Sequence, residues 1–560
     1  MTETMSAKRI LVVGGVAGGA ACATRLRRLD EQAEIFVFER GNHVSFANCG
    51  LPYYVGGVIP DRKQLLVASP ERFRDWFNIE VRTRSEVCSI DRDAKTILVR
   101  NVQTGAETTQ RYDALVLSPG ATPQRPPVPG IDLPGVFTLR NLDDADRILD
   151  AIQRQKPHSA VVIGAGYVGL EMVENLVRRG IKTTVLERLD QVMPPMDPEM
   201  VAPVQQELAR QEVRLKLSCG VAAIEAGGPA GLTVVDAGGE RTAAGVVLVA
   251  AGVKPDVALA RQAGLEIGAR GGIVVDAQMR TSDPAIWAVG DAVEVSDVVT
   301  GQYTLVALAG PAVRQARVAA DAICGRPSRY RGTQGTAVVG LFGMTLAMTG
   351  ATEKALRRSG LPYEKIYIHS PDHASYYPDA QMMTLKLIFS PRDGRILGAQ
   401  AVGRGGVEKR IDVIAMALQT GATVYDLEEA ELCYAPQFGT AKDPVDVAGF
   451  VAANVLRGDV GLAHWAELKA RTDAGESPLV LDVRTAAEVS AASISGSVRI
   501  PLGELRKRLG ELPRDREILV HCAAGQRAYY ACRILKQNGF TVRNLSGGMK
   551  TYQAGGDRGR

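Results

Sequence analysis

Short apolar runs alternate with longer amphipathic segments near the start of the chain. Residues 8–14 (KRILVVG) are almost continuously apolar, which predicts a parallel strand that is buried on both faces. A glycine-rich turn, a helical segment and a second apolar run that ends at Glu39 follow. The same order of strand, turn, helix and strand recurs over residues 159–188. This pattern predicts an α/β fold that contains two βαβ units.

The first turn reads GGVAGG over residues 14–19 and opens a predicted helix. Gly14 and Gly19 match the GxGxxG spacing of dinucleotide-binding turns, but Val16 occupies the middle position. Glu39 lies 25 residues after Gly14, where a carboxylate can hold the hydroxyl pair of a ribose while the helix N-terminus faces a pyrophosphate. Because this motif is incomplete, a turn with a purely structural role remains an alternative interpretation.

The second turn carries the complete motif, with Gly164, Gly166 and Gly169. Glu187 ends the following strand, 23 residues after the first of these glycines. Its carboxylate should accept from the adenosine ribose and repel a 2′-phosphate, which favours NADH over NADPH. Arg188 comes next and could accommodate that phosphate, so the sequence leaves NADPH open.

Two dinucleotide sites in one chain predict a flavin that receives hydride from a nicotinamide. Residues 114–123 (ALVLSPGATP) predict a strand and a turn where the chain passes from one domain to the other. Residues 281–294 predict a strand that ends in Gly290 and Asp291, and an aspartate there can bond the ribityl chain of a flavin. We therefore expect FAD and NADH as cofactors.

The stretch HVSFANCGLPYYVGG carries a solitary cysteine. Cys49 has no second cysteine within the next thirty residues, and the next one is Cys88. A single thiolate can attack an S–S bond, but it must then wait as a mixed disulfide or persulfide because no second thiol resolves it. A short helix is expected near Asn48, since Pro52 follows, and should lower the pKa of the thiol. Ser45 and Asn48 could hold substrate, or serve only as a helix cap and a turn.

With these turns and the SFANCGLPYY stretch, residues 8–455 resemble the pyridine nucleotide-disulfide oxidoreductases. The chain is most similar to the single-cysteine branch of coenzyme A-disulfide reductases and NADH-dependent persulfide reductases, whose first turn commonly reads GGVAGG. The resemblance implies a homodimer, with coenzyme A as substrate or tightly bound ligand. Single-cysteine NADH oxidases and peroxidases are the alternative, but Val16 and Ala17 stand where their first turn carries a histidine.

The candidate cofactor contacts combine the turns with positions that fit this resemblance. They are Gly14, Gly15, Val16, Ala17, Gly18, Glu39, Arg40, Asn48, Pro119, Gly120, Gly164, Gly166, Gly169, Glu187, Gly252, Gly290, Asp291 and Ala309. The resemblance also places Arg25 and Arg28 against the nucleotide end of coenzyme A, and Arg72 and Arg74 could add to that cationic cluster. A solvated basic helix face that includes Arg27 is the alternative for the arginines of the first helix.

Residues 330–452 alternate strands and helices, and KLIFSPRDGRILGAQAVG predicts a hairpin. This segment resembles the family's dimerisation domain, which brings residues of one subunit to the active site of the other. The resemblance implies that Tyr434 and Tyr376, preferred over Tyr377, reach that site, where a phenol could bond the substrate sulfur or protonate a leaving thiolate. Core packing is the alternative for these aromatics. Lys442 could meet a phosphate of coenzyme A.

A second sulfur site is predicted near the C-terminal end. The strand REILVHC runs directly into CAAGQRA and a helix, so backbone N–H groups surround Cys522, and Arg527 closes the loop. The motifs DVR, CxxGxR and NLxGG, in that order, make residues 463–560 resemble a single-domain rhodanese. That resemblance implies that Cys522 carries sulfane sulfur. Cys532 on the following helix is expected to pack in the core.

The expected fold class is α/β, with two nested Rossmann-like domains, an α+β dimerisation domain and an α/β rhodanese domain. Their expected bounds are residues 6–120 and 252–329 for FAD, 121–251 for NAD(P)H, 330–452 for dimerisation, 453–462 for a linker and 463–560 for the rhodanese.

Charge and hydropathy argue against a nucleic-acid-binding protein and against a membrane protein. A net charge of +4, without a long run of Lys and Arg, does not indicate nucleic acid. No stretch of 18 apolar residues exists and the first apolar run is too short for a signal peptide, so we expect no membrane segment and a cytoplasmic protein. Eight cysteines without a disulfide framework or a metal-ligand spacing predict reduced thiols and no metal.

These features predict the NADH-driven, FAD-dependent reduction of small persulfides (of coenzyme A or glutathione, or polysulfide) and of coenzyme A disulfide through Cys49, while Cys522 handles sulfane sulfur. A sulfur carrier or redox sensor with a vestigial flavin half is the alternative from another class. The two turns and Cys49 argue against it, and a yellow protein that NADH bleaches would exclude it.

Overall fold

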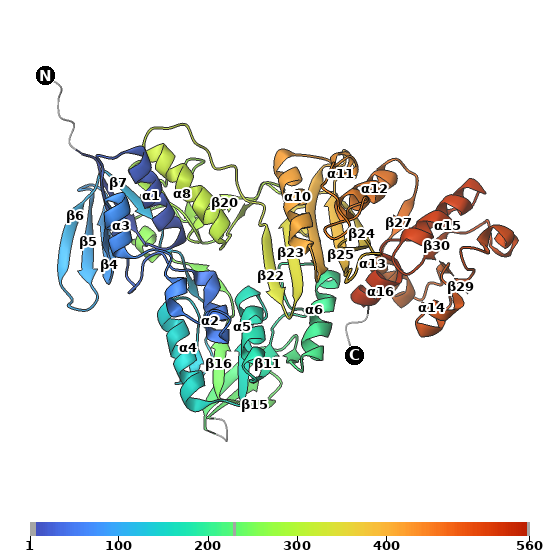
Figure 1. Cartoon of the computed structure of the whole chain (residues 1–560), viewed down its shortest axis with the longest axis horizontal. Helices are drawn as coiled ribbons and strands as arrows, with labels where there is room; N and C mark the ends of the chain where they lie inside the picture. Colours follow the sequence, from blue (N-terminus) through green and yellow to red (C-terminus); the bar gives the residue numbers. More distant parts are fainter. Residues whose placement is uncertain (1–6, 228–230, 557–560) are drawn as a thin grey trace. The chain divides into compact units, whose positions relative to one another are not determined.

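The structure is a computed structural model that describes residues 7–227 and 231–556. The expected domain ends at residues 6 and 560 lie outside the described residues. The chain divides into two compact units (Figure 1). The first contains the chain up to Asp190 and Gln211–Thr333, and the second contains Gln191–Arg210 and the chain from Gln334 onward.

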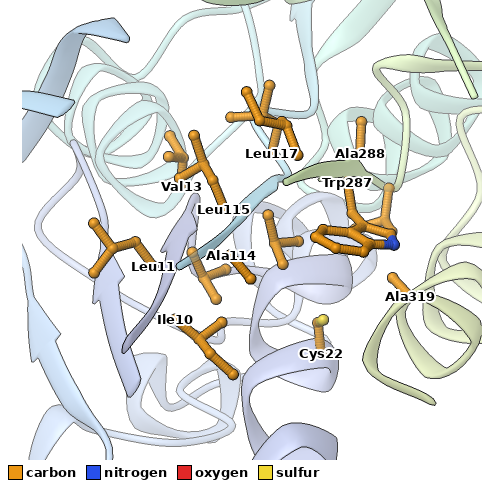
Figure 2. Packing of buried hydrophobic residues seen from close by; sticks show 14 of the residues in the cluster. Ile10, Leu11, Val13, Cys22, Ala114, Leu115, Leu117, Trp287, Ala288 and Ala319 are labelled. Atoms are coloured by element: carbon orange, nitrogen blue, oxygen red, sulfur yellow. The ribbon is translucent and has the colours of Figure 1, made fainter. Parts of the chain in front are cut away.

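A parallel five-stranded sheet forms the N-terminal part of the first unit. Its strands, in order, are β19 (Ile286–Ala288), β7 (Ala114–Leu117), β1 (Arg9–Val13), β2 (Glu34–Phe38) and β3 (Glu80–Arg82). β1 is buried from Ile10 to Val13, as its apolar run predicts. Figure 2 shows Leu11, Leu115 and Trp287, from three neighbouring strands, in one core.

The neighbouring strands β7 and β19 are separated in sequence by the whole second nucleotide domain. The chain leaves this sheet through β8 (Ala121–Pro123) and returns through β17 (Val253–Pro255), which pairs with β8 antiparallel. The intervening sheet is also parallel, in the order β12 (Arg214–Lys216), β11 (Lys182–Leu186), β10 (Ser159–Ile163), β16 (Val246–Val249) and β9 (Val136–Phe137). The predicted nesting of two dinucleotide folds is confirmed.

Helices follow the two turns, and smaller antiparallel sheets flank the large ones. α1 (Ala17–Leu29) packs against α8 (Ala309–Ile323), and α5 (Tyr167–Arg178) begins at the second turn. The smaller sheets consist of β4 (Ser85–Asp91), β5 (Thr96–Asn101) and β6 (Glu107–Arg111), and of β13 (Val221–Ala226), β14 (Leu232–Asp236) and β15 (Arg241–Ala244).

The second unit contains an antiparallel sheet. Its order is β22 (Ala337–Leu341), β23 (Met344–Gly350), β26 (Ile396–Gly403), β25 (Met382–Phe389) and β24 (Glu364–Pro371). β25 and β26 form the predicted hairpin. α10 (Val407–Thr420) and α12 (Pro444–Leu456) pack on the strands, and β26 is buried along its whole length.

A parallel sheet with the order β27 (Gly461–Ala463), β31 (Val542–Leu545), β30 (Ile518–His521), β28 (Leu479–Asp482) and β29 (Val498–Arg499) completes the second unit. α15 (Gln526–Gln537) and α16 (Gly548–Gly556) belong to this part. The expected linker at residues 453–462 is largely structured, because α12 continues to Leu456 and β27 begins at Gly461.

α6 (Pro198–Arg210) belongs to the second unit, although its sequence lies between two strands of the second nucleotide sheet. A buried ion cluster anchors it. Lys386 on β25 is 0 % exposed, and its Nζ donates to carboxylates of Asp197 at 2.7 Å, Glu199 at 2.5 Å and Glu353 at 2.5 Å. A buried charge is tolerated only beside such partners, so the cluster ties α6 to the sheet.

Replacing Lys386 by methionine should destabilise the second unit by about 3–5 kcal/mol, because three buried carboxylates would lose their cation. Burial opposes the ionisation of Glu353, but Lys386 and Lys365 outweigh it and hold its pKa below the ordinary 4.5. This contribution to stability is therefore present above pH 4.5, and is lost as the pH falls further. Urea unfolding followed by circular dichroism at neutral pH, with the exposed Lys507→Met as control, measures the effect. Equal midpoints for the two variants would contradict it.

Candidate functional site

The two glycine turns are built from backbone atoms in direct contact. Gly14 has φ +90°, and a Cβ there would lie 2.1 Å from the carbonyl oxygen of Ser118. A Cβ at Gly19 would lie 1.8 Å from the carbonyl oxygen of Gly14. Gly164 and Gly169 are confined in the same way, with backbone oxygens at 2.4 and 2.1 Å. Only glycine lets the strand end and the helix start approach so closely.

The middle position of the motif has a different requirement. A Cβ at Gly166 would meet no described atom within 4 Å, so the fold itself does not demand glycine there. In the first turn Val16 precedes α1 at this position and is half-buried. A middle glycine therefore serves a ligand that approaches the backbone, and the departure at Val16 leaves the turn itself intact.

A cleft of about 770 Å³ opens beside the first turn, within the range of cofactor sites. The expected contacts that line it are Gly14, Val16, Ala17, Gly18, Glu39, Arg40, Asn48, Pro119, Gly120, Gly290 and Asp291. Gly15, Gly252 and Ala309 are not among its lining residues. It is also lined by residues that sequence reasoning missed, among them Cys88, Arg100, Arg140 and Gln262. These lie far from the first turn in sequence and in no recognisable motif.

Each turn is bonded to the acid that ends the next strand. The carboxylate of Glu39 accepts the N–H groups of Gly15 at 2.9 Å and Gly41 at 2.7 Å. Glu187 accepts the N–H of Ala165 at 2.7 Å from the corresponding place in the second turn. A carboxylate has about four acceptor sites, so both acids can still accept from a ribose.

Two polar groups of the cleft fit a hydroxyl-bearing cofactor such as the expected flavin. Oδ1 of Asn48 is buried and has no hydrogen-bond partner among the described residues. Burial raises the pKa of Asp291, and Arg140, with Nη2 at 3.4 Å from the carboxylate, offsets this only in part. Donors on a bound cofactor would satisfy both groups.

Cys49 lies in a 3₁₀ turn that continues into the short helix α2 (Leu51–Gly56). The residue is exposed, and its neighbour Asn48 lines the cleft. The expectation that this helix lowers the pKa of the thiol is wrong. Desolvation of the sulfur, followed by the negative charges of Glu171 and Asp291, raises the pKa of Cys49, and the backbone hydrogen bond opposes this too weakly.

Glu171 is a residue that sequence reasoning missed. It lies on α5, two residues after Gly169, and its Oε1 accepts from the hydroxyl of Tyr53 at 3.4 Å. Burial raises the pKa of Glu171 to about 7. A carboxyl that titrates near neutrality beside a thiol can hold or accept a proton. The stretch GYVGLE is visible in the sequence, but only the fold brings its glutamate near Cys49.

The arginines expected at the nucleotide end of a substrate are not equally available. Arg25 donates to Asp321 at 2.8 Å and thereby ties α1 to α8. Arg27 is buried and donates to backbone carbonyl groups. The candidates that remain exposed are Arg28, Arg72 and Arg74. Arg72 covers the ring of Trp76 at 4.0 Å, and Arg74 pairs with Asp75. On α1, Arg28 is therefore the exposed arginine that could still meet a substrate phosphate.

Ser45 has a structural part in the loop before Cys49. Its φ is +48°, its N–H donates to the carbonyl oxygen of Gly15 at 2.8 Å, and its carbonyl oxygen accepts from Val67 at 2.9 Å. Ser45 is half-buried and is not among the residues that line the cleft. These bonds favour the turn alternative over substrate binding.

The second unit presents the expected tyrosines together. The hydroxyl groups of Tyr376 and Tyr434 lie 2.8 Å apart, and the two residues are 74 % and 48 % exposed. Tyr377 instead packs its ring edge-on against His373, with the centroids 5.8 Å apart. Lys442 is exposed. Core packing is thereby excluded for Tyr376 and Tyr434.

The predicted sulfur-carrying loop follows β30. The N–H of Gly525 donates to Sγ of Cys522 at 3.1 Å, and α15 begins at the next residue. Arg527 forms two bonds with Glu488, at 2.8 and 2.5 Å, and Glu488 together with the thiol of Cys522 raises the pKa of the guanidinium. Cys532 is buried, and desolvation raises its pKa to about 12, so its packing role is confirmed.

Family models match three parts of the chain. The match described as pyridine nucleotide-disulphide oxidoreductase covers residues 8–318, that described as its dimerisation domain covers 336–443, and that described as a rhodanese-like domain covers 464–555. Within the described residues, no helix has the length and apolar character needed to cross a membrane.

Individual proteins are similar over most of the chain. A Staphylococcus aureus coenzyme A disulfide reductase is 35 % identical over 451 residues, which are 79 % of this chain and 99 % of that protein. The reduced Bacillus anthracis CoADR-RHD structure is 46 % identical, covers 98 % of both chains and superposes with a TM-score of 0.96. The NAD-dependent persulfide reductase from A. fulgidus is 39 % identical, with a TM-score of 0.90, over 97 % of this chain and 100 % of its own.

Glu171→Gln should lower the pKa of the Cys49 thiol, because one of the two negative charges that raise it would be removed. The pH profile of iodoacetamide alkylation, read on the peptide that contains Cys49, should shift to lower pH. Glu212→Gln, at an exposed carboxylate remote from Cys49 in sequence, is the control. A profile that stays in place or moves upward would show that Glu171 does not act on the thiol.

Proposed function

The chain belongs to the pyridine nucleotide-disulphide oxidoreductase family, and from this premise we propose that it uses NADH to reduce S–S bonds of small thiol compounds. Our proposed substrates are persulfides of coenzyme A or glutathione, polysulfide, and coenzyme A disulfide. The observation that carries this proposal is Cys49, an exposed free thiol beside a residue of the cofactor cleft. All eight cysteines are free, which fits the cytoplasmic location that we propose.

In the proposed reaction, the sulfur of Cys49 attacks an S–S bond and one half of the substrate leaves as a thiolate. Cys49 then holds the other half as a mixed disulfide, or holds a single sulfur atom as a persulfide. Glu171 can accept the thiol proton before the attack, because its pKa of about 7 lies near the working pH. When FAD is bound, it supplies the electron pair from NADH that releases the held sulfur as a thiol or as hydrogen sulfide.

The leaving thiolate needs a proton, and we assign this role to the tyrosine pair. The Tyr434 hydrogen bond raises the pKa of Tyr376, so the phenol stays protonated. In the homodimer that the dimerisation domain supports, the exposed hydroxyl groups of Tyr376 and Tyr434 would complete the active site of the other subunit. The exposed cations Arg28 and Lys442 are our candidates for the phosphates of coenzyme A.

Cys522 is the second reacting thiol of the proposal. The Gly525 N–H that points at its sulfur stabilises a thiolate or a persulfide, and Arg527 supplies a positive charge nearby. We propose that Cys522 accepts and donates sulfane sulfur without consuming NADH. Cys49 remains the site of reduction.

Cys49→Ser should retain the fold and the bound flavin but lose NADH-dependent reduction by at least about a thousandfold, because the nucleophile is gone. Steady-state NADH oxidation with coenzyme A disulfide and with glutathione persulfide measures this loss. Cys324→Ser, at a half-buried cysteine that does not line the cleft, is the matched control and should stay active. Normal sulfide release by the Cys49 variant would refute the proposed mechanism.

NADH should have a higher specificity constant than NADPH, by at least about tenfold, because like charges at close range cost several kcal/mol near a protein surface. Glu187 is buried and held by its own backbone contacts, so it cannot withdraw from a 2′-phosphate. Glu187→Gln should bring the specificity constants for NADH and NADPH closer together. Glu212→Gln, well away from the turn in sequence, should not change their ratio. A wild-type preference for NADPH would mean that the exposed Arg188 decides the specificity instead.

A further inference from the structure

The edge strand of the dimerisation sheet is covered by the rhodanese-like domain of the same unit. β24 lies at the end of the sheet order, and an uncovered edge strand would present unpaired backbone groups. The N–H of Tyr367 on this strand donates to Oγ of Ser546 at 3.3 Å. Tyr367 is 3 % exposed and Ser546 is 4 % exposed, so this bond lies in a closed junction.

Side chains of β24 make two more polar contacts across this junction. Nε2 of His369 lies 3.0 Å from Oγ1 of Thr551, and its Nδ1 lies 2.9 Å from Oγ1 of Thr384. Burial lowers the pKa of His369 to about 4, so the ring is neutral at pH 7 and one nitrogen donates while the other accepts. Glu364 bonds Nε2 of His464 at 2.9 Å.

Tyr367 itself is fixed from the other side. Its hydroxyl donates to Oε1 of Glu199 at 2.7 Å, and the Nζ of Lys386 lies 5.4 Å from the centre of its ring. The buried ion cluster that holds α6 therefore also holds the residue that meets Ser546. On the side of the dimerisation sheet, the junction is therefore formed by a tyrosine that a hydrogen bond and the nearby ammonium group hold in place.

These contacts hold residues 546–551, and this segment in turn bonds to the Cys522 loop. The N–H of Met549 donates to the carbonyl oxygen of Cys522 at 2.8 Å, and that of Lys550 donates to the carbonyl oxygen of Ala523 at 3.0 Å. Thr551, which contacts His369, follows directly in α16. The first turn of α16 thus bonds the sulfur-carrying loop on one side and β24 on the other.

Gly547 and Gly548 let the start of α16 approach both Tyr367 and the Cys522 loop closely. A Cβ at Gly548 would lie 2.4 Å from the carbonyl oxygen of Cys522, and a Cβ at Gly547 would lie 2.9 Å from Cβ of Tyr367. A Cβ at Gly525, whose N–H donates to the sulfur, would lie 3.4 Å from the backbone nitrogen of Gly547. Gly547 therefore lies between the Cβ of Tyr367 and the backbone of Gly525, with little space for a side chain of its own.

The rest of the junction is packed less completely. A cavity of about 250 Å³ lies between residues of α6, β24, β25 and α16, and it is lined by Glu199, Tyr367, His369, Lys550 and Thr551 among others. α16 also packs against α6 and α13 (Trp465–Asp473). The polar contacts from β24 therefore act together with this helix packing and fix its first turn beside the Cys522 loop.

We propose that Tyr367 and His369 of the dimerisation domain are positioning residues for sulfur transfer at Cys522. They hold residues 546–551, which in turn hold the loop whose Gly525 N–H faces the thiol. The sulfur-transfer site is thus completed by a neighbouring domain. This inference rests on the proposed role of Cys522, and it adds a dependence that an autonomous rhodanese domain would not have.

Thiosulfate and cyanide are the probes for this step. The thiolate of Cys522 attacks the outer sulfur of thiosulfate, the S–S bond breaks, and sulfite leaves with its electron pair. Cyanide then takes the terminal sulfur of the persulfide to form thiocyanate, and the Cys522 thiolate is restored. No NADH is consumed, so this assay is independent of Cys49.

The experiment compares full-length variants that carry their flavin. His369→Leu removes both hydrogen bonds of the ring, His369→Gln keeps an amide that can bond Thr551, and Thr551→Val removes the hydroxyl with little change of shape. Ser370→Ala, at a buried position of the same strand, is the matched control. Thiocyanate formation, NADH-dependent reduction, and the rate of alkylation at Cys522 are measured for each.

We expect His369→Leu and Thr551→Val to lower kcat for thiocyanate formation about tenfold and to change the rate at which Cys522 is alkylated, because a displaced loop loses the Gly525 donor. His369→Gln should recover most of the rate, and Ser370→Ala should match wild type. NADH-dependent reduction should stay within about twofold throughout, since the contacts that these variants change are remote from Cys49 in sequence.

If His369→Leu and Thr551→Val both transfer sulfur at the wild-type rate, with an unchanged rate of alkylation at Cys522, the inference is overturned and the proposed function stands. An inactive wild type would instead remove the proposed role of Cys522, and the inference with it. Equal loss of reduction and sulfur transfer in Thr551→Val would reveal general unfolding, and would overturn the claim of a positioning role.

Discussion

Both cofactor sites depend on a backbone contact that leaves no space for a side chain. At Gly14 and Gly19, and again at Gly164 and Gly169, strand ends and helix starts meet at distances that only glycine permits. That contact aims the N-terminus of a helix at the place where a pyrophosphate binds. The acid at the end of the next strand bonds back to the turn, so strand, turn, helix and carboxylate form one rigid unit. Building this unit twice in one chain lets electrons pass from a nicotinamide to a flavin.

The electrostatics around Cys49 fit a thiol that lacks a resolving partner. Desolvation of the sulfur, together with the negative charges of Glu171 and Asp291, raises the pKa of Cys49 and so favours its protonated form. Burial raises the pKa of Glu171 to about 7, so this charge itself changes near neutral pH. In the reaction that we propose, the thiol becomes nucleophilic when its proton is removed, and the bonded hydroxyl groups of Tyr376 and Tyr434 are the proposed source of the second proton. A single cysteine suits small thiol carriers, because nothing in the protein competes for the mixed disulfide.

In the second unit, a chain of contacts links the buried ion cluster to the Cys522 loop. The ammonium of Lys386 compensates three buried carboxylates, holds α6 on the dimerisation sheet and lies beneath the ring of Tyr367. From Tyr367 the contacts continue through Ser546 to the support of the Cys522 loop. The S. aureus relative is matched over almost its whole length by about four fifths of this chain. In the present chain, the rhodanese-like domain covers the edge strand β24 and bonds to it.

The sequence by itself determined the two nested dinucleotide folds, the hairpin of the dimerisation sheet, and the two loops that carry Cys49 and Cys522. These features depend on local patterns: apolar periodicity, glycine spacing, and a cysteine placed directly after a strand. Tertiary structure alone decided that Glu171 lies near Cys49, that Arg25 is committed to an ion pair, and that the pKa of the redox thiol is raised. Pairings across long sequence separations and the desolvation of a charge depend on which surfaces meet, and no local pattern records that.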